Sequence, residues 1–224
     1  MNTKLSFYII GFCLLFHCAS NAQDNFQFGL LPVLNINKKI GEGFRLNFKT
    51  EAREVLYRES DFDFQHELTD FSLILSRKTG LNNSIAAGYL LRFRGGKTFH
   101  RAIQQFTITR KYPSFRLAHR FSSDQTFTES ESMELRVRYR ISGQFPLNGQ
   151  SLDAKEFYLK TNNEYLNSFE EDDYDLEIRL NLILGFEFND NSKVELGIDQ
   201  RFDSFLEDQL RMKSWLIMAW YYSW

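Results

Sequence analysis

Arginine recurs at alternate positions in one segment of the chain, as Arg136, Arg138 and Arg140. Alternate residues of an extended strand point to the same side, so these guanidinium groups would share one face. Clustered arginines bind phosphate and carboxylate groups. They could equally pair with acidic residues of neighbouring strands and fill the interior of a narrow barrel.

We predict that this interior is built from alternate residues of several strands. The candidates are Arg116, Arg120, Glu134, Arg136, Arg138, Arg140, Glu164, Glu177, Arg179 and Glu187. We favour a structural salt network for this set. The alternatives are a binding site for an anionic group and an Arg/Glu-lined passage.

Hydrolytic chemistry would need a nucleophile beside a base, and the nearest candidates are His119 with Ser122 or Ser123. On a strand His119 and Ser122 point to opposite faces, and Ser123 lies ~13 Å along the strand from His119. His66, His100 and His119 have no metal-ligand spacing. We therefore expect no catalytic residue, metal or cofactor. The acidic residues 170–173 could hold a cation, but we interpret them as a solvated loop.

The elements that would position these residues follow from a period of two. In residues 133–141 the odd positions are apolar and the even positions are Glu or Arg, which is the pattern of a strand with two different faces. The same reading gives eleven candidate strands, most of them long for a soluble sheet. They are residues 26–38, 44–57, 64–77, 84–94, 98–110, 115–127, 131–145, 155–167, 174–188, 193–203 and 207–224.

The connections between these strands are of two kinds that alternate. One kind is compact and rich in Gly, Asn and Pro, as in residues 39–43 and 146–149, and the other is polar or acidic, as in residues 168–173. This order predicts an all-β fold, an antiparallel up-and-down transmembrane β-barrel. A barrel whose two ends lie on the same side has an even number of strands, so we expect twelve, with ten as the alternative.

The first 22 residues have the features of a cleaved signal peptide. Lys4 precedes an apolar run, and Ser20 and Ala22 supply the small residues of a cleavage site. A lipoprotein signal that uses Cys18 is the alternative. Both cysteines lie in this segment, so residues 23–224 would form the barrel domain without a disulfide. A formal net charge of −2 makes a nucleic-acid binder improbable on electrostatic grounds.

The last segment suggests which face points outward. Apolar residues alternate up to the final Trp220, Tyr222 and Trp224. A terminal amphipathic strand with a final aromatic residue is similar to the sorting signal that the barrel-assembly machinery reads in outer-membrane proteins. We expect an outer-membrane location, with the apolar faces toward lipid and these aromatic residues at the interface. The alternative is a soluble barrel with its apolar face inside.

The whole mature chain resembles the outer-membrane barrels grouped as domain of unknown function 2490. The resemblance rests on residues 115–121, 135–140, 162–165, 178–186 and 196–200, taken in this order; His119 stands where the family pattern has Arg. It implies an outer-membrane barrel and no particular activity. We therefore expect a structural or interaction role, with a small passive channel and a membrane-embedded lipid hydrolase as alternatives.

Overall fold

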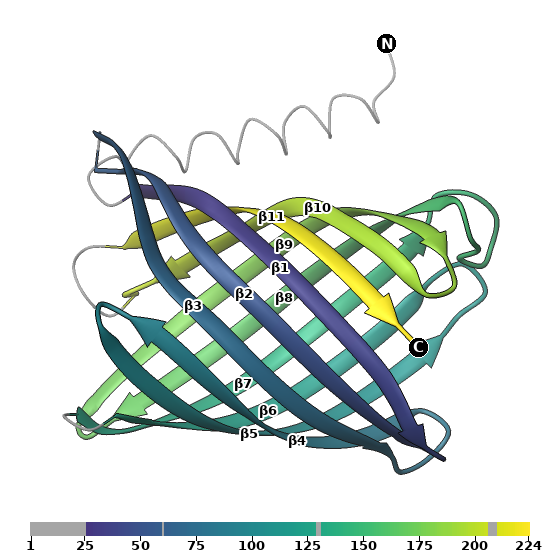
Figure 1. The fold of residues 1–224 in the computed structure, drawn as a ribbon, viewed down its shortest axis with the longest axis horizontal. Coiled ribbons are helices and arrows are strands. Elements are labelled where there is room, and N and C mark those ends of the chain that lie inside the picture. Colours follow the sequence, from purple (N-terminus) through teal and green to yellow (C-terminus); the bar gives the residue numbers. More distant parts are fainter. Residues whose placement is uncertain (1–25, 60, 129–130, 206–209) are drawn as a thin grey trace.

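The computed structural model describes residues 26–59, 61–128, 131–205 and 210–224. These residues form eleven strands around one closed barrel (Figure 1). The strands are β1 (Phe26–Gly41), β2 (Phe44–Arg58), β3 (Asp61–Lys78), β4 (Asn83–Arg94), β5 (Lys97–Lys111), β6 (Arg116–Thr128), β7 (Glu131–Pro146), β8 (Glu156–Glu170), β9 (Asp173–Asn189), β10 (Ser192–Asp203) and β11 (Arg211–Ser223). No helix in the described ranges has the length and hydropathy needed to cross a membrane. The predicted signal peptide lies outside the described residues.

The predicted all-β barrel is confirmed, and its closure differs from the expected one. Each strand pairs antiparallel with its neighbours in the sequence, but β1 pairs with β11 in parallel, from Phe26↔Met212 to Asn37↔Ser223. A fully antiparallel ring needs an even number of strands, whereas one parallel pair allows an odd number. The described residues therefore form eleven strands, as the alternation itself indicated, and not the twelve or ten inferred from parity.

The odd count places the two ends of the barrel chain at opposite rims. In Figure 1 β1 begins at the left end of the barrel, and the chain after β11 ends at the right. We call the rim at the start of β1 the acidic rim, because its strand ends and connections carry Asp61, Asp63 and residues 170–173. We call the other the basic rim, because its strand ends carry Lys39, Lys78 and Lys111 among other cations.

Short turns fix the register of several hairpins. Gly95 and Gly96 connect β4 to β5 with φ angles of 57° and 76°, values that residues with a side chain rarely adopt. Two successive residues of this kind make the tight hairpin turn whose twist matches that of the strands. The hairpin register then places Arg92 and Leu90 of β4 on the interior face.

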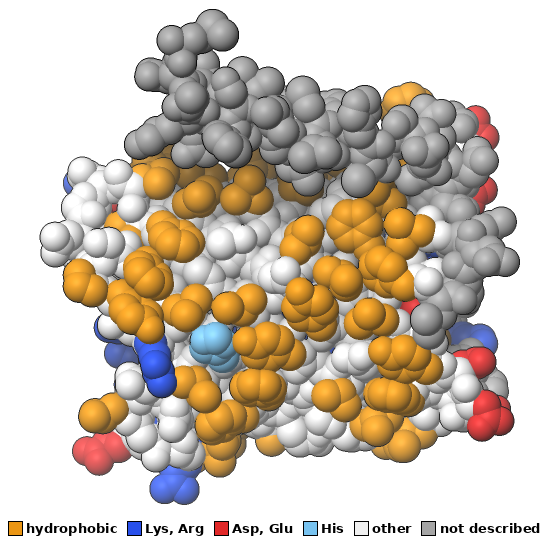
Figure 2. Space-filling view, turned by 180° about the vertical axis from the view of Figure 1, so that it is seen from behind, with side chains coloured by type: hydrophobic (Ala, Val, Ile, Leu, Met, Phe, Trp, Pro, Cys, Tyr) orange, Lys and Arg blue, Asp and Glu red, His pale blue; other side chains and the backbone are white. Residues whose placement is uncertain are grey.

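The two faces of the sheet have opposite character. The outer surface carries exposed apolar side chains on every strand, including Phe121, Leu182 and Ile198. Figure 2 shows these hydrophobic groups spread over one side of the barrel, with the charged groups gathered mainly toward its two ends. The interior face carries buried charged residues such as Asp124, Arg136 and Glu164. Strand alternation thus separates polar from apolar residues in the direction opposite to that of a water-soluble barrel.

An apolar cluster also occupies the interior. It consists of Leu31, Val55, Ile183, Trp215, Ile217 and Ala219. Val55 on β2 and Ile183 on β9 belong to strands separated by β10, β11 and β1, so this cluster reaches across the barrel. Trp215 is only 1% exposed, and Gly29 makes room for it, since a Cβ at Gly29 would lie 2.6 Å from the Trp215 ring.

Candidate functional site

Asp124 on β6 is the centre of one group of charged residues in the interior. Its side chain is 0% exposed, and one of its oxygens accepts a hydrogen bond from Arg136 Nε at 2.7 Å. Arg138 Nη2 lies 2.5 Å from the other oxygen, and Arg101 Nε lies 3.4 Å from the first. One carboxylate therefore faces three guanidinium groups, and its charge alone cannot neutralise them.

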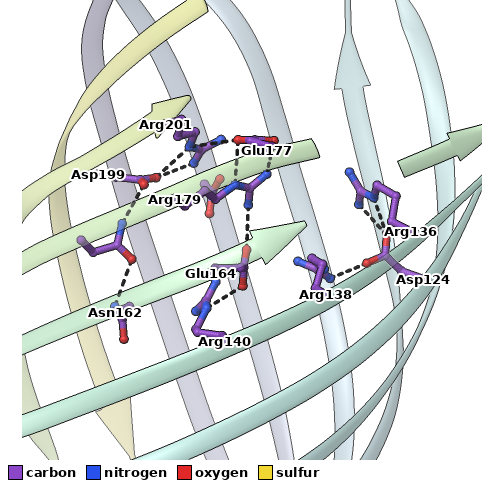
Figure 3. Close-up of polar contacts among 12 residues, drawn as sticks. Asp124, Arg136, Arg138, Arg140, Asn162, Glu164, Glu177, Arg179, Asp199 and Arg201 are labelled. Carbon is purple, nitrogen blue, oxygen red and sulfur yellow. Dashed lines mark hydrogen bonds and ion pairs between the residues drawn. The ribbon is translucent and has the colours of Figure 1, made fainter. Parts of the chain in front are cut away.

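A second group of interior residues forms a chain of alternating charges (Figure 3). Arg140 Nε donates a hydrogen bond to Glu164 at 2.6 Å, and the other oxygen of Glu164 lies 3.2 Å from Arg179 Nη1. Arg179 in turn donates to both oxygens of Glu177, at 2.8 and 2.9 Å. Such a bidentate pair fixes the guanidinium plane, so the chain holds β7, β8 and β9 in one relative position.

Asp199 on β10 extends this chain toward the apolar cluster. Arg201 donates to Asp199 at 2.6 Å and lies 4.0 Å from Glu177. Asn181 donates to the other oxygen of Asp199 at 2.7 Å, and Asn162 donates to Asn181 at 3.0 Å. The polar atoms of four strands are thereby linked from β7 to β10.

The sheet register explains why these residues meet. Directly opposed positions run around the barrel from Arg120 on β6 through Arg140, Glu164 and Arg179 to Arg201 on β10. Opposed residues of antiparallel strands have Cβ atoms about 5 Å apart. Glu164 between two arginines in this row is therefore stabilised by both neighbours.

Four predicted network residues lie apart from the chains just described. Arg116 is exposed at the basic rim, and Glu134 lies 3.8 Å from Arg136 at the periphery. Arg120 stands opposite Arg140 on the neighbouring strand, and its buried Nε has no hydrogen-bond partner in the described part of the chain. One oxygen of Glu187 is likewise buried without a partner there. The structure brings together the other six: Arg136, Arg138, Arg140, Glu164, Glu177 and Arg179.

Several network residues were missed by the sequence reasoning. Asp124 and Asp199 are single acidic residues among neutral neighbours, and Arg101 and Arg201 are isolated arginines. The available signal was their parity, because each falls on the polar face of its predicted strand. Lys160 and Glu195 form a further missed pair at 2.8 Å, to which the buried Tyr158 hydroxyl donates a hydrogen bond at 2.7 Å.

The histidine candidate for hydrolysis has a different partner. His119 Nδ1 shares a hydrogen bond of 2.8 Å with the Tyr139 hydroxyl on the outer surface. Ser122 is buried in the interior, and Ser123 accepts a hydrogen bond from Gln125. His119 is therefore engaged by a phenol, and neither serine is placed where His119 could remove its proton.

The remaining candidates are surface groups, namely the acidic residues 170–173 and the C-terminal aromatic residues. The described residues contain no cluster of three or more His, Cys, Asp or Glu that could hold a metal ion. In the acidic loop, Glu170 accepts a hydrogen bond from Ser132. Trp220, Tyr222 and Trp224 all project from the outer surface near the basic rim, and Trp220 donates a hydrogen bond to Ser192 at 2.9 Å.

The chemistry that this interior offers is mutual neutralisation of charge. Its acidic and basic groups are largely used by one another, and the buried hydrogen bonds to charged groups are of the strong kind. Breaking them one at a time would leave buried charges uncompensated, which is costly. The arrangement therefore resembles a rigid filling more than a prepared binding site.

A family model described as "Protein of unknown function (DUF2490)" matches residues 28–211, which extend from β1 to the first residue of β11. No curated protein and no solved structure matches the chain.

Proposed function

We propose that this chain, which belongs to the DUF2490 family of proteins of unknown function, is an outer-membrane β-barrel with a structural or interaction role. On this proposal the barrel spans the membrane, and its interior is filled by its own side chains. The strands run for 12 to 18 residues, which exceeds the ~9–11 residues that a tilted strand needs to cross a bilayer.

The observation that carries the proposal is the inverted distribution of polarity. Exposed Leu, Ile and Phe side chains cover the outer surface of successive strands, whereas carboxylates and guanidinium groups are buried inside. Monomeric soluble proteins rarely expose contiguous apolar patches beyond a few hundred Å². An outer surface of this kind is stable against lipid, and Trp220, Tyr222 and Trp224 would then lie in the interfacial aromatic belt.

The interior filling supports a role other than transport. Trp215 and its apolar neighbours fill part of the interior, and the salt networks of Asp124 and Glu164 fill other parts. Side chains fill the interior of small barrels, whereas larger porins keep an aqueous channel. We therefore rank a passive channel second.

The first test of the proposal is the location and folding of the protein in cells. We expect it in the outer-membrane fraction, where it should migrate faster on a gel before boiling than after, because the closed barrel resists detergent. Single substitution of an exposed loop residue, Glu171→Gln, serves as a control that keeps the shift. Recovery in the periplasmic soluble fraction without a heat-dependent shift would refute membrane insertion.

The channel alternative has its own measurement. Purified barrel in a planar lipid bilayer should give no stable conductance, since the interior cluster and ion pairs leave the passage filled. A well-known porin in the same bilayer serves as the positive control. Reproducible single-channel steps from the folded protein would replace the structural role with that of a passive channel.

A further inference from the structure

The basic rim carries a set of cations that have no acidic partner. None of these lysines and arginines forms an ion pair within the described residues, in contrast to most of the interior arginines. They are exposed near the ends of strands: Lys38, Lys39, Arg45, Arg77, Lys78, Arg110, Lys111 and Arg116. Unpaired cations gathered on one rim create a local positive potential that attracts anions.

Some of these cations stand beside aromatic rings on the outer surface. Lys38 Nζ lies 5.6 Å from the centre of the Trp224 ring, and the Arg77 guanidinium lies 5.2 Å from that of Phe44. Lys38 follows Leu34 and Ile36 on the outward-facing positions of β1. A cation next to an exposed aromatic ring is the combination found where a protein meets lipid headgroups.

An apolar groove begins on the same strand, farther from the rim. Its volume is about 620 Å³, and it lies over the outer surface of β2, β1, β11 and β10. Its lining includes Pro32, Leu34, Ala52, Leu196, Met218 and Trp220. Leu31 and Pro32 have no partner in the β1–β2 register, because proline has no N–H for the ladder. Ala52 on β2 and Pro32 on β1 form one side of the groove, and Met218 and Trp220 on β11 with Leu196 on β10 form the other.

The groove and the cations have the spacing of one lipid leaflet. Pro32 and Lys38 are six residues apart on β1, which is ~20 Å along a strand. A membrane strand tilted by about 40° converts this path to ~15 Å along the membrane normal, and half of a hydrocarbon core is also about 15 Å. With Lys38 at the interface, the groove would lie within the hydrocarbon of the same leaflet.

We propose that this surface is a binding site for an anionic phospholipid, with an acyl chain in the groove and the phosphate at Lys38. The inference rests on the proposed membrane insertion and adds a preferred lipid to it. Charge selects the headgroup, because the cations favour a net negative lipid over a zwitterionic one. The groove selects a long apolar chain, which neither a free phosphate ion nor a basic peptide supplies.

Trp220 provides a reporter at the end of the groove nearest to the basic rim, where it lies beside Leu34. The chain has three tryptophans; Trp215 is buried in the interior, so a Trp224→Phe background leaves Trp220 alone on the outer surface. Protein that shows the heat-dependent gel shift is placed in nanodiscs with phosphatidylglycerol or phosphatidylcholine that carries bromine on identical acyl chains. We expect brominated phosphatidylglycerol to quench Trp220 at a several-fold lower mole fraction than brominated phosphatidylcholine.

Two variants separate the two parts of the site. Lys38→Gln should reduce the preference for phosphatidylglycerol about fivefold. Ala52→Leu should fill the groove and reduce quenching by both lipids. The charge-matched control Arg58→Gln, at the opposite rim, should keep the preference of the parent protein.

The outcomes distinguish this site from the proposed function. Inserted protein that keeps its gel shift but is quenched equally by both lipids overturns the lipid site and leaves the membrane barrel standing. An unchanged preference in the Lys38→Gln variant also overturns it. Shielding of Trp220 from both lipids, together with a dimeric mass, would assign the groove to a second copy of the chain.

Discussion

The Asp124→Asn variant is expected to lower the free energy of unfolding by about 3–5 kcal/mol. The carboxylate of Asp124 is 0% exposed and faces Arg101, Arg136 and Arg138. The amide keeps the shape of the side chain but removes its charge, so three neighbouring cations remain with little compensation. Urea unfolding of the detergent-folded barrel, followed by tryptophan fluorescence, measures the loss.

Two further variants show whether charge is the cause. Arg138→Gln in the Asp124→Asn background should recover part of the lost stability, because it removes one of the uncompensated cations. Glu171→Gln removes a negative charge from an exposed loop and should change stability by less than about 0.5 kcal/mol. If Asp124→Asn costs no more than Glu171→Gln, the interior charges are solvated and the proposed rigid filling is wrong.

The Trp215→Ala variant is expected to have a similarly large effect through packing. Trp215 is among the largest fully buried side chains and belongs to the cluster that reaches from β2 to β9. Truncation of a buried tryptophan leaves a cavity and costs about 3–5 kcal/mol. The same urea experiment measures this loss of stability. The control is Trp224→Ala, which makes the same substitution at an exposed tryptophan.

The conservative replacement refines this prediction. Trp215→Phe should cost clearly less than Trp215→Ala, because Trp215 Nε1 has no hydrogen-bond partner in the described residues and the loss is one of volume alone. Equal costs for the two variants would mean that the indole shape itself is required. A cost near that of Trp224→Ala would show that the interior cluster contributes little.

Much of the fold could be predicted from the alternation of residues, and the closure could not. Segments 115–127 and 174–188 were predicted as strands and correspond to β6 and β9. The period of two also determines which residues share a face. The parallel pairing of β1 with β11 has no local signal, since it depends on how the far ends of the chain meet. A parity rule derived for fully antiparallel barrels therefore led to an incorrect strand number.

The sequence predicts which face of the sheet the site residues occupy, but it does not predict which of them pair with one another. The polar parity of Arg138, Arg140 and Glu164 follows from the sequence, but the pairing of Arg138 with Asp124 depends on strand register and side-chain reach. The apolar cluster was missed for a related reason. In the last strand Trp215, Ile217 and Ala219 alternate with an equally apolar outer set, so no contrast marks them as interior.

The parallel closure has a consequence for the rate at which the barrel folds. Every pairing except one joins strands that are neighbours in the sequence, so each of these pairings closes only a short loop. The pairing of Phe26 with Met212 instead closes a loop that contains nearly the whole described chain. The entropic cost of closure grows with loop length, by about 0.6 kcal/mol for each doubling. We therefore expect the pairing of β1 with β11 to be the slowest of the strand pairings to form.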